Sequence, residues 1–325
     1  MLAAGGTGGH LFPAFALAEE LGRRGYTVDL VTDMRGDRYG TGFPARAVHQ
    51  VPSATLASKS PLSVAKTGLA LAKGIVAARK LMKTVRPLVV VGFGGYPTFP
   101  PLIAARQLGI PTMLHEQNAV LGRANKMLAG RVNAIATSFE TTKFLEGPLL
   151  AKARFTGNPV RGIVLEAAAR VYPPLEPNGP FHVLIFGGSQ GARYFSDAVP
   201  PALTLLPAPL KSRLNVVQQA REEDVVRVRA AYHDAGIAAE ISPFFKDLPA
   251  RMAASHLVVG RAGASSVAEL TVIGRPSILV PLPHSLDNDQ LQNATQLAES
   301  GGAWCIEQKT LSPERLAYEI ARLME

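Results

Sequence analysis

The sequence has little cysteine, few aromatic residues and no long unbroken apolar segment. Cys305 is the only cysteine among 325 residues, which excludes an intramolecular disulfide or cysteine-based zinc site and favours a reducing compartment. The first five residues lack the basic and apolar segments of a signal peptide. The uncharged run over residues 87–105 is interrupted by glycines and prolines that would expose unpaired backbone in lipid. We therefore expect a cytoplasmic protein whose membrane contact is peripheral.

Acidic residues are absent from one long stretch. No Asp or Glu occurs between Asp37 and Glu116, and the whole chain carries a formal charge of +9. An excess of positive charge predicts an anionic partner, which composition leaves open among nucleic acid, an acidic lipid surface and a phosphorylated substrate. Basic residues in this stretch include Arg46, Lys59, Lys66, Lys73, Arg79, Lys80, Lys83 and Arg86.

Part of this basic stretch has helical periodicity. At about 100° per residue, Lys66, Lys73 and Lys80 fall on one stripe, and Leu69 and Val76 lie beside it. Such a face suits an interfacial helix, because each basic residue near an anionic leaflet contributes about 1 kcal/mol. An ordinary solvated lysine face is the alternative. Aromatic residues make up 6% of the chain and none punctuates the stripe, which argues against nucleic acid.

Short β-branched runs alternate with alanine-rich segments of helical character, a pattern typical of parallel βαβ units. A proline-rich stretch over residues 171–180 separates two sets of such runs, which places a domain boundary near residues 161–180. This predicts two doubly wound α/β domains of similar size. The predicted strands are 26–32, 88–92, 112–115, 134–137, 183–186, 216–218, 257–259 and 277–280.

Each half contains a glycine-rich turn after a strand. The first runs from Gly5 to His10, before a helix expected at Ala14–Gly22, and the second runs from Gly187 to Ala192. Glycines there let backbone amides approach a phosphate or sugar, although a tight turn without a ligand is the alternative. The first turn fits neither the P-loop pattern nor the dinucleotide pattern.

Two further segments of the second half are candidate binding elements. Ser265 and Ser266 are suited to capping a helix whose free amides would hold a diphosphate. Glu269, one turn further, is either a ribose ligand or a surface acid that complements the helix dipole. Asp287 and Asp289 form an Asp-x-Asp pattern, for which helix capping or substrate contact is favoured over a metal role.

Six motifs together carry a resemblance that extends over nearly the whole chain. They are Gly5-Gly6-Thr7-Gly8-Gly9-His10, Gly94-Gly95-Tyr96-Pro97, His115-Glu116-Gln117-Asn118, Gly157-Asn158-Pro159-Val160-Arg161, Gly187-Gly188-Ser189-Gln190-Gly191-Ala192 and Arg261-Ala262-Gly263. In identity and order they resemble the MurG family of UDP-GlcNAc transferases, which complete lipid II in bacterial peptidoglycan synthesis.

The resemblance implies a GT-B fold of two Rossmann-like domains facing a cleft. Residues 1–162 would form the acceptor-binding, membrane-associating domain and residues 163–325 the UDP-GlcNAc-binding domain. It implies inverting transfer to lipid I without a cofactor or an obligatory metal, at the cytoplasmic face of the inner membrane, with other cell-wall synthesis proteins as further partners. Alternatives are another GT-B enzyme, acting on diacylglycerol or epimerising UDP-GlcNAc, and a UDP-sugar-binding membrane adaptor without catalysis.

The resemblance also implies roles for individual residues. The acceptor-side group is Gly94, Gly95, Tyr96 and Glu116. His10 would be either the general base for the attacking hydroxyl or a contact of the departing diphosphate. The donor-binding group is Thr7, Gly8, Gly9, His10, Asn118, Arg161, Ser189, Gln190, Phe245, Ser265, Ser266, Glu269, Asp289 and Gln290.

Overall fold

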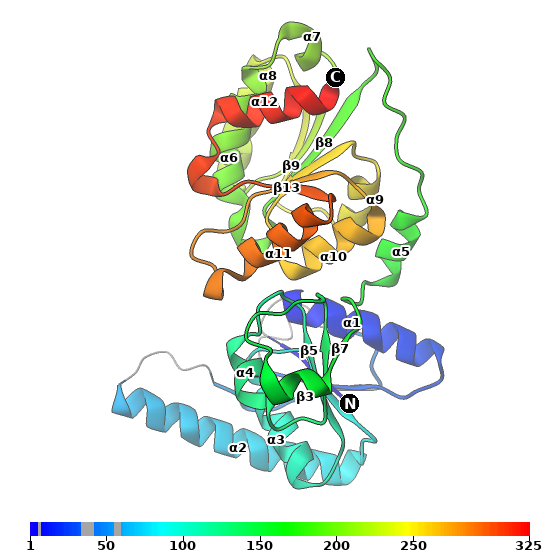
Figure 1. Cartoon of the computed structure of the whole chain (residues 1–325), viewed down its shortest axis with the longest axis vertical. Helices are drawn as coiled ribbons and strands as arrows, with labels where there is room; N and C mark the ends of the chain where they lie inside the picture. Colours follow the sequence, from blue (N-terminus) through cyan, green and yellow to red (C-terminus); the bar gives the residue numbers. More distant parts are fainter. Residues whose placement is uncertain (6–7, 34–41, 55–59) are drawn as a thin grey trace. The chain divides into compact units, whose positions relative to one another are not determined.

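The computed structural model describes residues 1–5, 8–33, 42–54 and 60–325. Within this part the chain forms two compact units, Met1–Gly162 and Ile163–Glu325 (Figure 1). Each unit has its own parallel β-sheet and its own apolar core. The predicted pair of parallel α/β domains is confirmed.

The first sheet has seven described strands in the order β3-β2-β1-β4-β5-β6-β7, and all its pairs are parallel. The strand order reverses between β1 and β4, and in open α/β sheets ligands bind at the carboxyl ends beside such a reversal. The strands are β1 Leu2–Ala3, β2 Asp29–Thr32, β3 Ala47–Gln50, β4 Val90–Gly92, β5 Thr112–Glu116, β6 Ala134–Thr137 and β7 Ala153–Phe155.

The longest helix of the first unit, α2 (Pro61–Val85), packs along α3 (light blue and cyan in Figure 1). A Cβ at Gly74 would lie 2.1 Å from the Pro52 carbonyl oxygen and 3.0 Å from Pro100. Only glycine therefore permits this close crossing. The other helices of the unit are α1 Gly8–Arg23, η2 Tyr96–Thr98, α3 Phe99–Gln107, α4 Arg123–Ala129 and η3 Gly147–Lys152, while α5 Gly162–Ala168 leads into the second unit.

The second sheet has six described strands in the order β10-β9-β8-β11-β12-β13, again with parallel pairs. Its strands are β8 Phe181–Phe186, β9 Leu214–Gln219, β10 Ala238–Ser242, β11 Leu257–Gly260, β12 Ser277–Leu279 and β13 Ala303–Cys305. Its helices are α6 Gly188–Thr204, α7 Ala208–Lys211, η4 Glu222–Asp224, α8 Val225–Asp234, α9 Leu248–Ala253, α10 Ala264–Ile273, η5 Leu286–Asn288, α11 Asp289–Glu299, η6 Gln308–Thr310 and α12 Pro313–Met324.

Two helices begin earlier than the pattern predicts. The first begins at Gly8 rather than Ala14, so His10 lies in the first turn of α1 and not in a loop before it. Likewise, α6 begins at Gly188, so Ser189 and Gln190 belong to its first turn. In both places the glycine lies at the start of the helix, where the backbone N–H groups of the helix have no intrahelical acceptor. Glycine is a poor helix former in general, so the pattern did not indicate a helix there.

Candidate active site

Three segments of the first unit meet at the carboxyl ends of β1, β4 and β5, which are neighbours in the sheet. His10 follows β1, Gly94 and Gly95 follow β4, and Gln117 follows β5. The two glycines have left-handed φ angles of 87° and 73°. A Cβ would lie 3.2 Å from His10 Cε1 if placed on Gly94, and 3.3 Å from His10 Cδ2 if placed on Gly95. The imidazole of His10 thus packs against the backbone of the two glycines, and a side chain at either position would push the ring away.

A chain of hydrogen bonds connects His10 to the interior. Its Nδ1 lies 3.1 Å from Gln117 Oε1. Gln117 Nε2 lies 2.9 Å from both Nδ1 and the carbonyl oxygen of His115, and His115 Nε2 lies 3.1 Å from the Gly157 carbonyl oxygen. Gln117 and His115 are buried, whereas His10 is half-buried. Burial lowers the pKa of His115 to about 4, so this ring is neutral near pH 7.

Glu116 is directed into the same unit rather than to its surface. Its Oε1 accepts the backbone N–H of Asn118 at 3.0 Å, and its Oε2 accepts the N–H of Gly122 and Nδ2 of Asn125, each at 2.8 Å. Burial raises the pKa of this carboxyl, and the donors oppose that rise by stabilising the charge. Glu116 therefore shapes the loop that follows β5, and its contact with an acceptor stays a prediction.

The remaining predicted residues of the first unit lie on the loops around this edge. Asn118 is half-buried beside Glu116, and Tyr96 begins η2. The guanidinium of Arg161 lies 4.1 Å from the centroid of the Phe12 ring, on the first turns of α1. Gly8 and Gly9 are the first residues of that helix, and Thr7 lies outside the described residues.

In the second unit, Gln219 connects the ends of three strands. Its Oε1 accepts the N–H of Gly187 at 3.3 Å, and its Nε2 donates to the carbonyl of Pro243 at 3.1 Å. The connection links the turn before α6 to the loop that carries Phe245. The Phe245 ring is buried beneath the guanidinium of Arg251, 4.4 Å from its centroid. The side chains of Ser189 and Gln190 lie outside the described part of this turn.

The start of α10 differs from its predicted form. Gly263 is the N-cap and makes no side-chain cap, whereas Ser265 and Ser266 lie inside the first turn. The prediction that these serines cap the helix is therefore wrong, because a capping side chain must precede the helical residues. The Ser265 hydroxyl is buried and makes no hydrogen bond to any described residue. Glu269 is only 7% exposed, which excludes the alternative of a surface acid.

Gln290 holds the neighbouring loops together. Its Oε1 accepts the N–H groups of Ala262 at 3.2 Å and Leu282 at 3.0 Å, so the ends of β11 and β12 are fixed against the start of α11. The preceding Asp287 and Asn288 have left-handed φ angles of 53° and 56°. Asp289 Oδ1 accepts the N–H of Gln290 at 2.7 Å. In the described part of the chain, no group of three or more His, Cys, Asp or Glu side chains is arranged for a metal.

Sequence reasoning missed several residues that organise these edges. Gln117 and His115 belong to a quoted motif, but nothing in the pattern assigned them a role. The Arg261 guanidinium is buried, donating to the carbonyls of Val280 and Pro281 at 3.0 and 3.2 Å and to Gln308 Oε1 at 2.7 Å. The only sign of this role in the sequence was an arginine next to a glycine. In the structure its hydrogen bonds hold neighbouring segments of the unit together.

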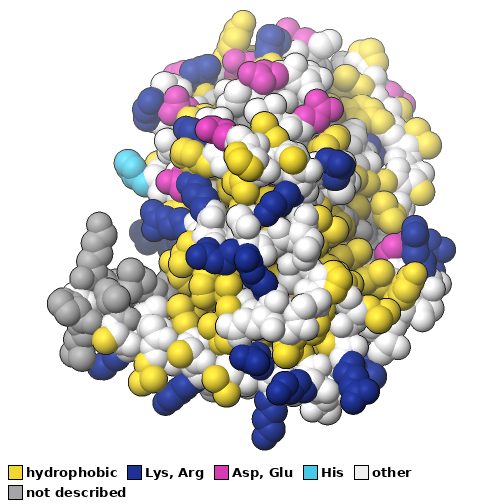
Figure 2. Space-filling view, turned by 60° about the horizontal axis from the view of Figure 1, so that its bottom comes forward, with side chains coloured by type: hydrophobic (Ala, Val, Ile, Leu, Met, Phe, Trp, Pro, Cys, Tyr) yellow, Lys and Arg dark blue, Asp and Glu magenta, His cyan; other side chains and the backbone are white. Residues whose placement is uncertain are grey.

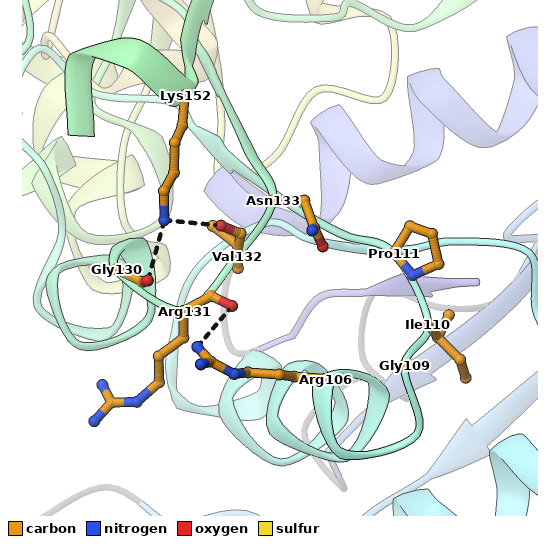
Figure 3. A pocket seen from close by; sticks show the side chains of 9 residues that line it. All are labelled: Arg106, Gly109, Ile110, Pro111, Gly130, Arg131, Val132, Asn133 and Lys152. Atoms are coloured by element: carbon orange, nitrogen blue, oxygen red, sulfur yellow. Dashed lines mark hydrogen bonds between the residues drawn. The ribbon is translucent and has the colours of Figure 1, made fainter. Parts of the chain in front are cut away.

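A pocket of about 520 Å³ lies at the opposite edge of the first sheet, by the amino ends of β5, β6 and β7 (Figure 3). Lys152 Nζ donates there to the carbonyls of Gly130 and Val132, each at 3.0 Å, and Arg106 donates to the carbonyl of Arg131 at 3.1 Å. These cations satisfy carbonyls beyond the end of α4. None of the predicted site residues lines this pocket.

The predicted basic stripe lies on the exposed face of α2. Lys66, Lys73 and Lys80 are exposed, and the exposed fractions of Leu69 and Val76 are 59% and 68%. Figure 2 shows Lys and Arg side chains among hydrophobic ones over the lower part of the view. Among the described helices, none is long and apolar enough to cross a bilayer.

Comparison with known proteins gives consistent matches for both units. Residues 1–137 match the glycosyltransferase family 28 N-terminal domain, and residues 182–325 match the glycosyltransferase family 28 C-terminal domain. A relative from Rhizobium rhizogenes is 55% identical over 98% of this chain and 84% of its own length. One from Brucella abortus is 54% identical, covering 100% of this chain and 85% of its own length. Both are named UDP-N-acetylglucosamine--N-acetylmuramyl-(pentapeptide) pyrophosphoryl-undecaprenol N-acetylglucosamine transferase.

Solved structures agree with this fold. The crystal structure of MurG from Acinetobacter baumannii aligns with a TM-score of 0.78 and 31% identity, covering 100% of this chain and 89% of that one. A putative UDP-N-acetylglucosamine 2-epimerase from Listeria monocytogenes aligns with a TM-score of 0.69, over 99% of this chain and 87% of that one. Its 13% identity shows a shared fold alone.

Proposed function

The chain belongs to glycosyltransferase family 28, and from that premise we propose that it transfers N-acetylglucosamine from UDP-GlcNAc to the 4-hydroxyl of the muramoyl sugar of lipid I. The products are lipid II and UDP. The observation that carries the proposal is the 55% identity, over 98% of the chain, to a transferase named for this reaction. The low identity of the epimerase match gives the epimerase alternative no comparable support.

The donor is assigned to the second unit. Helices α6 and α10 both begin directly after a strand, at glycine-containing turns. Their first-turn amides and dipoles suit a diphosphate, and the Ser265 hydroxyl, buried with no hydrogen-bond partner in the described part of the chain, lies in the first turn of α10. Glu269, buried one turn later, would accept the ribose hydroxyls.

The remaining donor contacts in the proposal come from both units. The side chains of Ser189 and Gln190 and the backbone near Phe245 would meet the nucleotide. Asn118 and Arg161, with the Thr7 to His10 turn, would face the sugar and diphosphate, and Asp289 and Gln290 would border the donor on the side of α11. No metal or cofactor is needed in this scheme, since the N-termini of α6 and α10 would face the diphosphate.

The chemical step requires a base on the acceptor side. His10 would remove the proton of the attacking hydroxyl as its oxygen forms a bond to the anomeric carbon, on the face opposite the nucleotide. The bond from that carbon to the diphosphate oxygen breaks, and its electron pair leaves with UDP. Attack from the opposite face inverts the anomeric configuration. The proton taken by His10 then passes to solvent.

We assign the acceptor approach to a peripheral contact at the cytoplasmic face of the inner membrane. The polyprenyl tail of lipid I stays in the bilayer, so the first unit must reach the headgroups. The exposed lysines of α2 supply charge for an anionic leaflet, and Leu69 and Val76 supply apolar groups beside them.

A turnover assay tests the proposal. Purified protein with UDP-GlcNAc should release UDP and form lipid II when lipid I is present, and should do neither with diacylglycerol. Epimerisation of UDP-GlcNAc without acceptor would favour the epimerase, and binding of UDP-GlcNAc without UDP release would favour the adaptor. Either result would overturn the proposal.

A further inference from the structure

We propose that Gln117 is a positioning residue that fixes His10 in the tautomer protonated at Nδ1, so that Nε2 carries the lone pair that accepts the proton of the attacking hydroxyl. The inference rests on the transfer reaction proposed above. It is carried by the direction of the hydrogen bonds between His10 and the interior, which two backbone carbonyls determine.

The first carbonyl settles the orientation of the Gln117 amide. A carbonyl oxygen only accepts hydrogen bonds, so the group 2.9 Å from the His115 carbonyl oxygen must be the amide nitrogen. The amide oxygen, Oε1, therefore faces His10 Nδ1 at 3.1 Å. Because an amide oxygen also only accepts, Nδ1 of His10 must carry the hydrogen.

The second carbonyl settles the state of His115. The carbonyl oxygen of Gly157 accepts from Nε2 of this ring at 3.1 Å, and the ring stays neutral because burial disfavours its charged form. Its Nδ1 therefore has a lone pair, which accepts the second N–H of Gln117 at 2.9 Å. A reversed amide would place its oxygen against this lone pair and against the His115 carbonyl oxygen. Both side chains are buried, so water cannot relieve that conflict.

The direction of these hydrogen bonds distinguishes between the two roles considered for His10, general base and diphosphate contact. In the neutral ring Nε2 offers a lone pair and no hydrogen, which suits a base but not a phosphate contact. A phosphate contact through Nε2 would require the protonated ring. Gln117 Oε1 accepts from Nδ1 in either state, so proton uptake at Nε2 needs no rearrangement of this bond.

The tautomer can be measured without turnover. In protein labelled with ¹⁵N in its histidine rings, with the His10 signals assigned by His10→Gln, the neutral wild-type ring should show a protonated Nδ1 and an unprotonated Nε2. In Gln117→Leu the ring should return toward the Nε2–H form that free histidine prefers. A wild-type ring protonated at Nε2 would overturn the inference, and so would a Gln117→Leu ring that keeps the wild-type tautomer.

Kinetics provide a second readout that a purely structural role would not move. Gln117→Leu should lower kcat about 100-fold, the order of a general-base contribution, while UDP affinity stays within about twofold of wild type. Gln117→Glu keeps an acceptor toward His10 and should move the acid limb of the kcat profile to higher pH, because a carboxylate stabilises the imidazolium. Gln107→Leu, the same change at an exposed position on α3, should leave both readouts unchanged.

The outcomes distinguish this inference from the proposed function. Unchanged kcat and pH profile in both Gln117 variants would refute the positioning role even if lipid II is formed. A protein with His10 protonated at Nδ1 that forms no lipid II would instead refute the transfer reaction.

Discussion

The free energy of unfolding of the first unit should fall as the pH drops from about 6.5 to about 4, because the unfolded chain then binds a proton at His115 that the folded unit excludes. Burial lowers the pKa of this ring from 6.5 to about 4 in the folded unit. A histidine with a lowered pKa contributes its full stability above the unfolded value and loses it as the pH falls through the folded value. Protonation would also remove the lone pair that accepts from Gln117 Nε2.

The size of the loss follows from the two pKa values. Each pKa unit corresponds to about 1.4 kcal/mol, so the unit should lose about 2 kcal/mol by pH 5 and about 3 kcal/mol by pH 4. Against a typical stability of about 5–15 kcal/mol for a domain, this loss is large.

The comparison requires a variant that keeps the bond to Gly157 but does not titrate. His115→Gln satisfies this requirement, since its amide nitrogen can replace the ring Nε2 as donor. Hydrogen exchange of the β5 amides, corrected for the intrinsic effect of pH, should show a steeper loss of protection with acid in wild type than in the variant. Titration of groups that are present in both proteins, including Glu116 with its raised pKa, affects β5 protection in both alike. These contributions cancel when wild type and variant are compared.

The chain has an internal control. Trp304 is the only tryptophan and lies in the second unit, so its fluorescence during urea unfolding should respond to pH equally in both proteins. Equal acid sensitivity of β5 protection in wild type and His115→Gln would refute the reasoning, since the ring would then not be held neutral by the fold.

Four other perturbations have expected outcomes. Glu269→Ala should raise the donor KM more than it lowers kcat, because ribose contacts are alike in the ground and transition states; an unchanged KM in steady-state assays would remove Glu269 from the site. Activity should persist in excess EDTA, and a loss restored by magnesium or manganese would make Asp287 and Asp289 candidate ligands. Changing Lys66, Lys73 and Lys80 to Glu should abolish binding to anionic vesicles in sedimentation assays, while the affinity for UDP is kept. The same change at the exposed Lys309, Arg315 and Arg322 of the second unit should leave vesicle binding intact. Vesicle binding by the first variant would show that the lysine stripe is only a solvated face. Gly74→Ala should destabilise the fold by about 3 kcal/mol in urea titrations, because its Cβ meets the Pro52 carbonyl oxygen. Gly68→Ala on the same helix, with no described atom within 4 Å of its Cβ, should stabilise the fold by up to about 1 kcal/mol. Equal effects of the two substitutions would contradict the close approach of α2 to its neighbours at Gly74.

The central strands were predictable from sequence, and the edge strands were not. The buried run of β8 reads as a parallel strand covered on both faces. Besides the two-residue β1, which the sequence shows only as the strand before the first glycine-rich turn, the pattern missed β3, β7, β10 and β13, the outermost strands of the two sheets. They are largely half-buried or exposed, so they carry no continuous apolar signal.

The sequence predicted which positions form the site, but not the hydrogen bonds that connect them. Strand ends and glycine turns indicated where His10 and Gly94 would lie, because carboxyl ends of parallel strands share one edge. Nothing local to His10 indicated that Gln117, 107 residues away, would face its Nδ1. The capping prediction for Ser265 was wrong for a related reason, since whether a serine precedes or enters a helix depends on one residue of register.

The outermost strands also bear on edge-to-edge pairing between copies of the chain. An unpaired strand edge presents backbone groups to which another chain can add. Here the outer strands are three to five residues long, and two of them carry charged side chains, Arg154 and Glu240. Short, charged edges are poor templates for edge-to-edge aggregation.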